Sequence, residues 1–310
     1  MSRLDVTTSV PVFTRPFRST GSGVPASEAP PLSLAASLVG QQVGHFRLLR
    51  ELGRGRLGIV LLAEHALIQK RVAIQVLHAH VTQDPARVAR FLQAARTLTL
   101  IQDAHIVSLY DLGMRDGRPY LVMEYLEGQR LAAFAKGPLA PALVVDLLTQ
   151  VCDALGAAHA HGVAHGSLNP TSIFLVPDAK GRQHVKLLDF GIAGLLPPSE
   201  GAADLPVAAD LFAVGVLGAL LVAGRLSSRG HAAEVPPLPS DLPSALSRVL
   251  LKAMARRPVD RYANAAELRD ALHASVALDG GAAPPESLGL ERLPGWYAPW
   301  GPPGAAPASR

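Results

Sequence analysis

Residues 164–191 constrain the fold of this chain more than any other stretch. They read A-H-G-S-L-N-P-T-S-I-F-L, then a short loop, then H-V-K-L-L-D-F-G. A polar loop is followed by the apolar run 173–175, and a second apolar run leads into an acidic turn at Asp189. These pieces in this order and spacing are far more specific than any one of them alone.

This stretch resembles the catalytic loop and the metal-binding turn of protein kinases, which read H-R-D-L-x-x-x-N and D-F-G. The matching residues are His165, Leu168, Pro170, Asp189, Phe190 and Gly191. The residues that carry the chemistry in the loop differ. Ser167 stands at the position of the family's catalytic Asp, and Ser172 stands at the position of the Asn that holds a second Mg²⁺ ion. The Arg of the motif is replaced by Gly166.

Gly53, Gly55 and Gly58 form a G-x-G-x-x-G pattern, which is a weak signal by itself. A dinucleotide-binding fold would place a helix directly after these glycines. Here I-V-L-L follows, which reads better as a strand, so we expect a hairpin like the loop that covers the phosphates in kinases. A glycine turn without a ligand is the alternative. The resemblance also assigns Val60, in the second strand, to the nucleotide site.

Residues 71–76 read R-V-A-I-Q-V and resemble the V-A-I-K strand of the family. The resemblance places Ala73 against adenine and puts Gln75 where the family has the lysine that pairs with the nucleotide phosphates. Asp84 and Pro85 predict the start of the next helix. Aligning R-F-L-Q-A-A-R in that helix with R-F-L-x-E-A-R puts Ala94 at the glutamate that pairs with this lysine.

Residues 119–128 read P-Y-L-V-M-E-Y-L-E-G and resemble the hinge between the two lobes of a kinase. The resemblance implies that Met123 lies at the back of an adenine pocket. By position, Glu124 would supply a backbone carbonyl, and Leu126 an amide and a carbonyl. Phe174, in the apolar run after the catalytic loop, belongs to the same implied pocket.

Two later segments continue the resemblance. D-L-F-A-V-G at 210–215 is similar to the start of the central buried helix, and R-R-P-V-D-R-Y at 256–262 is similar to K-x-P-x-x-R-[YF]. Only residues 192–209 separate the D-F-G turn from that helix, and no A-P-E is present. The resemblance thus implies a shortened activation segment and leaves Arg261 without its usual glutamate, with Asp204 as a replacement partner.

We therefore expect an α+β fold with two lobes, a small β-rich N-lobe and a larger helical C-lobe, as in bacterial Ser/Thr protein kinases. The kinase-like domain is predicted at 44–276, with the N-lobe at 44–124, the hinge at 124–128 and the C-lobe at 129–276. Residues 1–43 and 277–310 are rich in small residues and Pro, and they predict a disordered arm and a disordered tail.

Phosphoryl transfer in this family needs Mg²⁺, a cation on the phosphates and an acceptor for the proton of the substrate hydroxyl. Of the residues that map to these parts, only Asp189 is intact, as the metal ligand. The degenerate positions are Gln75, Ala94, Ser167 and Ser172. A serine hydroxyl accepts a proton poorly near neutral pH. Losing both members of an ion pair leaves no stranded buried charge, so the changes form a consistent set.

These residues predict a degenerate kinase, or pseudokinase, that acts as a binding or regulatory module. The resemblance implies weak ATP binding, with Mg²⁺ at Asp189. The alternative is a residual Ser/Thr protein kinase or another ATP-dependent transferase, because Arg54 or Arg56 of the glycine loop could replace the missing lysine.

Composition argues against several other classes. The formal net charge is +4 and the basic residues are spread along the chain, which argues against nucleic-acid binding. The single cysteine, Cys152, allows no internal disulfide, and the histidines lack metal-ligand spacing. The longest apolar run, 211–222, is short for a membrane span and predicts a buried helix. We expect a cytoplasmic protein with a protein partner, such as a kinase or signalling protein, and no membrane contact.

Overall fold

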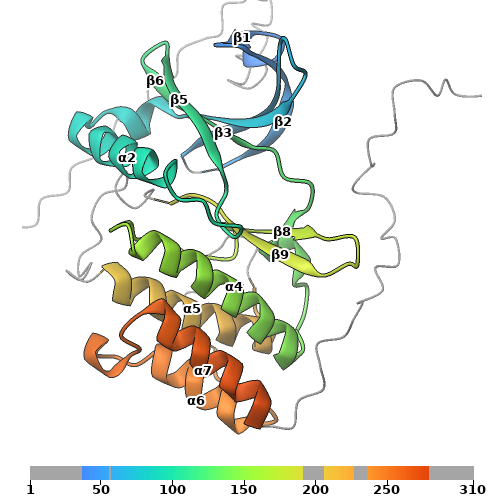
Figure 1. The fold of residues 1–310 in the computed structure, drawn as a ribbon, viewed down its shortest axis with the longest axis vertical. Helices are drawn as coiled ribbons and strands as arrows, with labels where there is room; N and C mark the ends of the chain where they lie inside the picture. Colours follow the sequence, from blue (N-terminus) through green and yellow to red (C-terminus); the bar gives the residue numbers. More distant parts are fainter. Residues whose placement is uncertain (1–36, 56, 191–205, 227–235, 279–310) are drawn as a thin grey trace, which may run out of the picture.

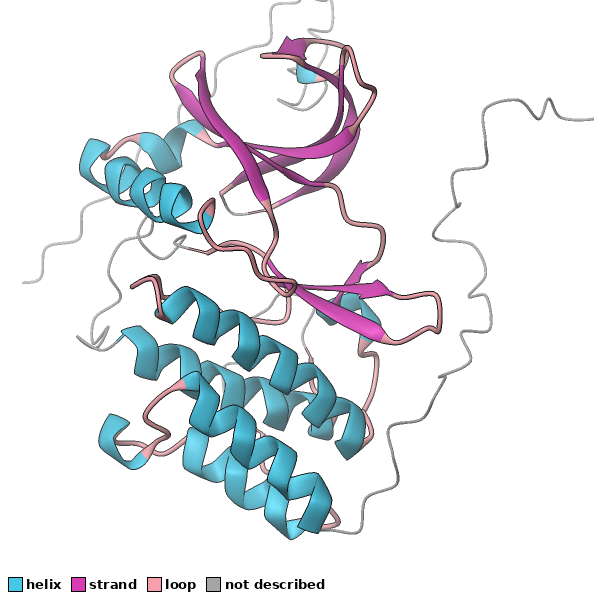
Figure 2. Ribbon diagram, in the orientation of Figure 1, coloured by secondary structure: helices cyan, strands magenta, loops and turns pink. Residues whose placement is uncertain are grey.

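The computed structural model describes residues 37–55, 57–190, 206–226 and 236–278, which form two lobes joined by a short connection (Figures 1 and 2). The upper lobe is a curled antiparallel sheet with one long helix beside it, and the lower lobe consists mainly of helices. The predicted two-lobed α+β fold is confirmed.

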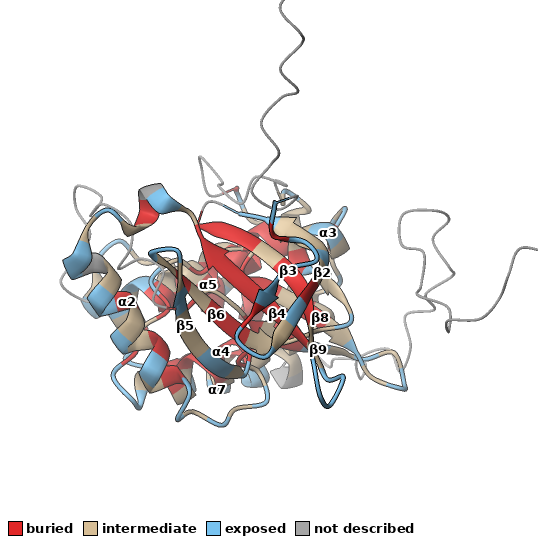
Figure 3. Cartoon of the chain, turned by 90° about the horizontal axis from the view of Figure 1, so that it is seen from above, coloured by how far each residue is buried: buried red, intermediate tan, exposed pale blue. Residues whose placement is uncertain are grey.

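The N-lobe is built on a six-stranded antiparallel sheet with strand order β1-β2-β3-β4-β6-β5. Its strands are β1 (Gln42–Val43), β2 (Phe46–Arg54), β3 (Gly58–His65), β4 (Arg71–Leu77), β5 (Leu109–Arg115) and β6 (Arg118–Glu124). β3 and β4 are its most buried strands, as Figure 3 shows from above. Asp116 and Gly117 join β5 to β6 with φ of 49° and 71°, because a tight two-residue hairpin turn needs positive φ at both positions.

Helix α2 (Pro85–Leu98) lies beside this sheet and follows the short 3₁₀ helix η1 (Ala79–Thr82). Its predicted start is confirmed, because Oδ1 of Asp84 accepts a hydrogen bond from the backbone N–H of Ala86 at 2.9 Å. Phe91 and Ala95 pack with Leu121 of the sheet. α2 thereby forms one side of the space behind the cleft between the lobes.

The chain leaves β6 at Glu124 and enters a three-stranded sheet of order β7-β8-β9. Its strands are β7 (Gln129–Arg130), β8 (Ile173–Pro177) and β9 (Gln183–Leu187). The predicted hinge corresponds to this connection. Gly128 fits tightly there: a Cβ at this position would lie 2.0 Å from the carbonyl oxygen of Leu175 in β8.

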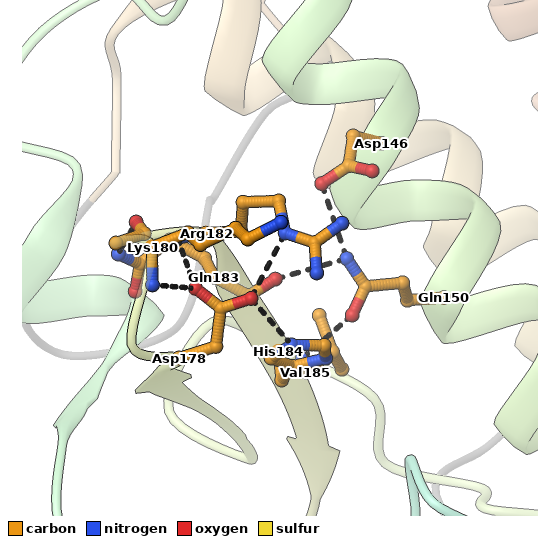
Figure 4. Close-up of polar contacts among 9 residues, drawn as sticks. Asp146, Gln150, Asp178, Lys180, Arg182, Gln183, His184 and Val185 are labelled. Carbon is orange, nitrogen blue, oxygen red and sulfur yellow. Dashed lines mark hydrogen bonds and ion pairs between the residues drawn. The ribbon is translucent and has the colours of Figure 1, made fainter. Parts of the chain in front are cut away.

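The β8–β9 hairpin beside the hinge is closed by a polar network (Figure 4). The Asp178 carboxylate accepts hydrogen bonds from the backbone N–H of Lys180 at 2.8 Å and of Arg182 at 2.9 Å, and from Nε of Arg182 at 2.9 Å. Partial burial alone would raise the pKa of Asp178, but these hydrogen bonds lower it to about 2. Gln150 of the C-lobe bonds the backbone of β9 at 2.8 and 3.0 Å and so fixes the hairpin to that lobe.

The C-lobe core forms around one helix that is apolar on all sides. The helices of this lobe are α3 (Leu131–Phe134), α4 (Pro141–His159), α5 (Pro206–Ala223), α6 (Ser244–Ala253) and α7 (Ala265–Leu278), with the 3₁₀ helix η3 (Pro258–Asp260) before α7. The run 211–222 lies in α5, a buried core helix as predicted. α4 and α5 are long and apolar enough to cross a membrane, but 56% of each apolar window is buried in the protein.

The folded domain starts before the predicted boundary at residue 44. Leu38 and Val43 are 7% and 3% exposed within the core of the N-lobe sheet, and β1 pairs with β2. At the other end, α7 continues to Leu278. Isolated apolar residues among Gly and Gln give no periodic signal, which is why the sequence pattern missed the first strand. The rest of the predicted arm and tail lies outside the described residues.

Candidate functional site

A cleft of about 1480 Å³ lies between the two lobes. The glycine-containing hairpin of β2 and β3 lines one side, and β8 with the loop before it lines the other. The residues predicted to bind nucleotide that line this cleft are Gly53, Gly55, Val60, Ala73, Met123, Glu124, Leu126 and Phe174. Gly58 does not line it. A Cβ at Gly58 would lie 2.1 Å from the carbonyl oxygen of Val76, so this glycine allows β3 to pack on β4.

The hinge presents unengaged backbone groups to the cleft. In the described part of the chain, no hydrogen bond engages the N–H or the C=O of Leu126, which lines the cleft. The Glu124 side chain, by contrast, accepts hydrogen bonds from the N–H of Ser108 at 2.8 Å and from Nζ of Lys186 at 2.7 Å, and so ties the hinge to β9. The N–H and C=O of Leu126 are therefore available to a heterocycle with a donor and an acceptor on one edge.

The loop at 164–172 is anchored by Asp210 of α5. The Asp210 carboxylate accepts hydrogen bonds from the backbone N–H groups of His165 and Gly166, both at 2.8 Å, and lies 2.9 Å from Nε2 of His159. The His165 ring packs 4.6 Å from the ring of Phe190. Burial lowers the pKa of His165, and the charge of Asp210 opposes this effect in part. The frame of the loop is therefore firmly held, although its reactive residues are replaced.

The Ser172 hydroxyl is buried and hydrogen-bonded within the loop. Ser172 is 1% exposed, and its Oγ donates to the carbonyl oxygen of Asn169 at 2.8 Å and accepts from the N–H of Asn169 at 3.1 Å. The Asn169 side chain accepts from the N–H of Thr171 at 2.8 Å and donates to the carbonyl oxygen of Ser167 at 2.7 Å. These hydrogen bonds all lie within residues 167–172 and stabilise the turn. Ser172 is not among the residues that line the cleft.

Ser167 and Asp189 both line the cleft on the C-lobe side. No hydrogen bond among the described residues engages the Ser167 hydroxyl. Asp189 has a φ of 66°, a left-handed conformation that Asp adopts more readily than most residues. Burial raises the pKa of Asp189, and the charge of Arg130 opposes this effect. Burial therefore disfavours the charged form of the Asp189 carboxyl.

The residues present offer Asp189 as a ligand for Mg²⁺ but do not fit the pair of Mg²⁺ ions that protein kinases hold. Mg²⁺ takes oxygen ligands in an octahedral shell, usually from carboxylates, waters and substrate phosphates. Ser172 is buried and does not line the cleft, and Glu124 is paired with Lys186. The described residues contain no group of three or more His, Cys, Asp or Glu placed to hold a metal ion. Asp189 alone cannot supply a two-ion site.

Gln75 and Ala94, which the alignment pairs, do not line the same cavity. Gln75 is 8% exposed and lines both the cleft and a small cavity of about 30 Å³ behind it. From α2, that cavity is lined by Phe91, Ala95 and Leu98, whereas Ala94 lies half-buried at the edge of this stripe. Neither Ala94 nor Ala95 carries a carboxylate, so Gln75 faces an apolar helix surface.

The arginines near the cleft differ in their hydrogen-bond and ion-pair partners. Arg54 bonds the Glu51 carboxylate at 2.5 and 2.9 Å, and Arg56 lies outside the described residues. Sequence reasoning missed three further arginines that line the cleft, Arg50, Arg71 and Arg130. Among them, Arg130 of β7 donates through Nη1 to the carbonyl oxygen of Thr171. The one signal that could have found it is its position just after the hinge.

Arg261 has partners other than a glutamate. It donates to the carbonyl oxygens of Ala255 and Ala208, both at 2.8 Å, and its guanidinium lies 4.8 Å from the centre of the Phe212 ring. Backbone carbonyls and an aromatic face thus take the place of the missing glutamate. Asp204, the predicted replacement partner, lies outside the described residues, as do Gly191 and most of the segment after it.

Comparisons with known proteins agree with this architecture. The family model described as protein kinase domain matches residues 46–219. The crystal structure of the Mycobacterium tuberculosis PknI kinase domain matches with a TM-score of 0.67 at 28% sequence identity, covering 76% of this chain and 98% of that chain.

The curated relatives are named serine/threonine-protein kinases. Serine/threonine-protein kinase Pkn1 of Myxococcus xanthus is 42% identical over 282 residues, covering 80% of this chain and 41% of the relative. Serine/threonine-protein kinase PknH of Mycobacterium bovis is 32% identical over 275 residues, covering 78% of this chain and 46% of the relative. The chain thus spans less than half the length of these relatives.

Proposed function

The chain belongs to the protein kinase domain family, and from that premise we propose that it is a pseudokinase, a nucleotide-binding module that does not transfer phosphate. The observation that carries this proposal is the burial and hydrogen bonding of the Ser172 side chain. Its hydroxyl is buried, and both of its hydrogen bonds run to Asn169 inside the loop. The position that holds the second metal ion in active relatives therefore offers no ligand to the cleft.

The proton acceptor is missing as well. Ser167 replaces the catalytic Asp, and a neutral hydroxyl neither removes a proton efficiently nor orients the attacking hydroxyl by charge. The carboxylates that line the described part of the cleft are Glu124, Glu127 and Asp189. Glu124 and Glu127 belong to the hinge, where the adenine ring of the nucleotide would lie, and not the hydroxyl group of a substrate. Asp189 would have to serve as both metal ligand and base.

Nucleotide binding needs less than transfer, and the parts for it remain. Val60 and Ala73 line the N-lobe side of the cleft, and Phe174 lines the C-lobe side, so apolar surface is available to both faces of a purine. The free backbone groups of Leu126 add directed hydrogen bonds. With a neutral amide at Gln75, we expect weak binding, at roughly micromolar to millimolar Kd. The module would then act by binding a protein partner.

Transfer is expected to be absent. The 310-residue chain incubated with ATP and either Mg²⁺ or Mn²⁺, alone and with generic acceptor proteins, should gain no phosphate by intact-mass analysis. The matched control is Asp189→Ala, which removes the one intact catalytic residue. Metal-dependent phosphorylation that disappears in Asp189→Ala would refute the proposal.

A further inference from the structure

Arg130 brings to the cleft a positive charge that forms no ion pair within the described part of the chain, although this charge acts on the Asp189 carboxyl in the same cleft. The ion pairs of that part involve other arginines, and none includes Arg130. Its one hydrogen bond there runs from Nη1 to the carbonyl oxygen of Thr171. A guanidinium carries five N–H donors, and Arg130 is exposed, so most of its donors remain open to a ligand.

The guanidinium of Arg130 lies between β7, which follows the hinge, and Thr171 of the loop at 164–172. The hinge backbone at Leu126 and the apolar walls would hold the base. The Thr171 carbonyl holds the guanidinium beside the loop that also carries Ser167. Arg130, Ser167 and Thr171 all line the same cleft. A nucleotide whose base lies at the hinge would extend its phosphates along this loop.

The positions that normally balance phosphate charge are neutral here. Gln75 replaces the lysine, and Ser172 is closed off in its own turn. Phosphate in a partly desolvated cleft still needs a cation. An arginine meets this need well, because its planar fork donates two charge-assisted hydrogen bonds to phosphate oxygens.

We propose that Arg130 is the cation that binds the phosphate groups of the nucleotide, and that this binding needs no divalent metal. The inference rests on the proposed function, because it takes the base to lie at the hinge. It adds a preference for nucleoside diphosphates and triphosphates over the bare nucleoside, which the apolar pocket alone would not produce.

Calorimetric titration of the full chain with adenosine, AMP and ADP, each in EDTA and in excess Mg²⁺, tests this proposal. In EDTA, ADP should bind about tenfold more tightly than adenosine, since hydrogen bonds to a charged group are strong. Added Mg²⁺ should change the ADP affinity by less than about threefold. Arg130→Ala and Arg130→Gln should lose the preference for ADP and keep the affinity for adenosine, while Arg130→Lys should keep most of the preference.

Arg47→Ala is the matched control, because Arg47 is an exposed arginine of β2 that does not line the cleft, and it should bind like the natural protein. Thermal melts of every variant confirm that it is folded. The proposal is overturned if ADP binds only with Mg²⁺, if ADP binds no better than adenosine, or if Arg130→Ala weakens both equally. Those three results leave the proposed function standing, whereas absence of binding by all three ligands would remove both.

Discussion

Asp210→Asn is expected to destabilise the protein by about 3–5 kcal/mol and to lower its melting temperature by roughly 10 °C. The Asp210 carboxylate is 1% exposed and accepts hydrogen bonds from the backbone N–H groups of His165 and Gly166, with His159 as a third neighbour. An amide places an NH₂ group against one of these donors and leaves it unsatisfied in the core. Removing a buried acceptor with several partners is one of the few single changes with so large an effect.

Asp153→Asn is the matched control, because it is the same substitution at a carboxylate that also has a basic partner. Asp153 lies 3.1 Å from Arg269, but its side chain is 39% exposed, and exposed ion pairs contribute about 0–1 kcal/mol. Chemical denaturation of both variants measures the difference. Equal stabilities for the two would mean that Asp210 does not anchor the loop, and the frame around Ser167 would lose its main support.

Gly128→Ala is expected to destabilise the protein by about 1–3 kcal/mol and to weaken nucleotide binding at the same time. An added Cβ would lie 2.0 Å from the carbonyl oxygen of Leu175 and 3.1 Å from the Phe174 ring. The hinge must therefore shift away from β8, and the shift displaces both Phe174 and the backbone of Leu126, which line the cleft. Stability and binding should fall together, because one contact controls both.

Gly137→Ala provides the control, because a Cβ at Gly137 would have no other atom within 4 Å. We expect a change within about 0.5 kcal/mol for this variant and unaltered binding. Denaturation midpoints and an adenosine titration measure both properties. Should Gly128→Ala resemble Gly137→Ala in both, the contact between the hinge and β8 would not define the cleft.

Most elements could be predicted because their signals are local. Asp84 with Pro85 marks a helix start by hydrogen bonding and fixed φ. Asp116 with Gly117 marks a hairpin, because an Asp-Gly pair readily adopts the positive φ values that a two-residue turn needs. The run 211–222 is apolar on every side and so becomes the central helix. Since each signal lies within a few residues, none depends on how the lobes pack.

The site could be predicted only in part, because side-chain direction and tertiary partners are not local properties. Successive residues in a helix differ in direction by about 100°, so a motif that identifies α2 still leaves open whether Ala94 or Ala95 faces Gln75. One backbone partner of Arg261, Ala255, lies just after α6 and close in sequence, but the other, Ala208, lies 53 residues away in α5. The role proposed for Arg130 depends on a cleft that only the folded chain creates.

The measurement that tests the central claim most directly is a single-turnover experiment with the protein in excess over ATP labelled at both the α and the γ phosphate. Chromatography of the quenched samples separates ATP, ADP, AMP, free phosphate and labelled protein, and so detects transfer of any part of the nucleotide. We predict that ATP is bound and that all label remains in intact ATP over many hours, as in Asp189→Ala. Label that appears on protein in a time-dependent way, and that is absent in Asp189→Ala, would contradict the account.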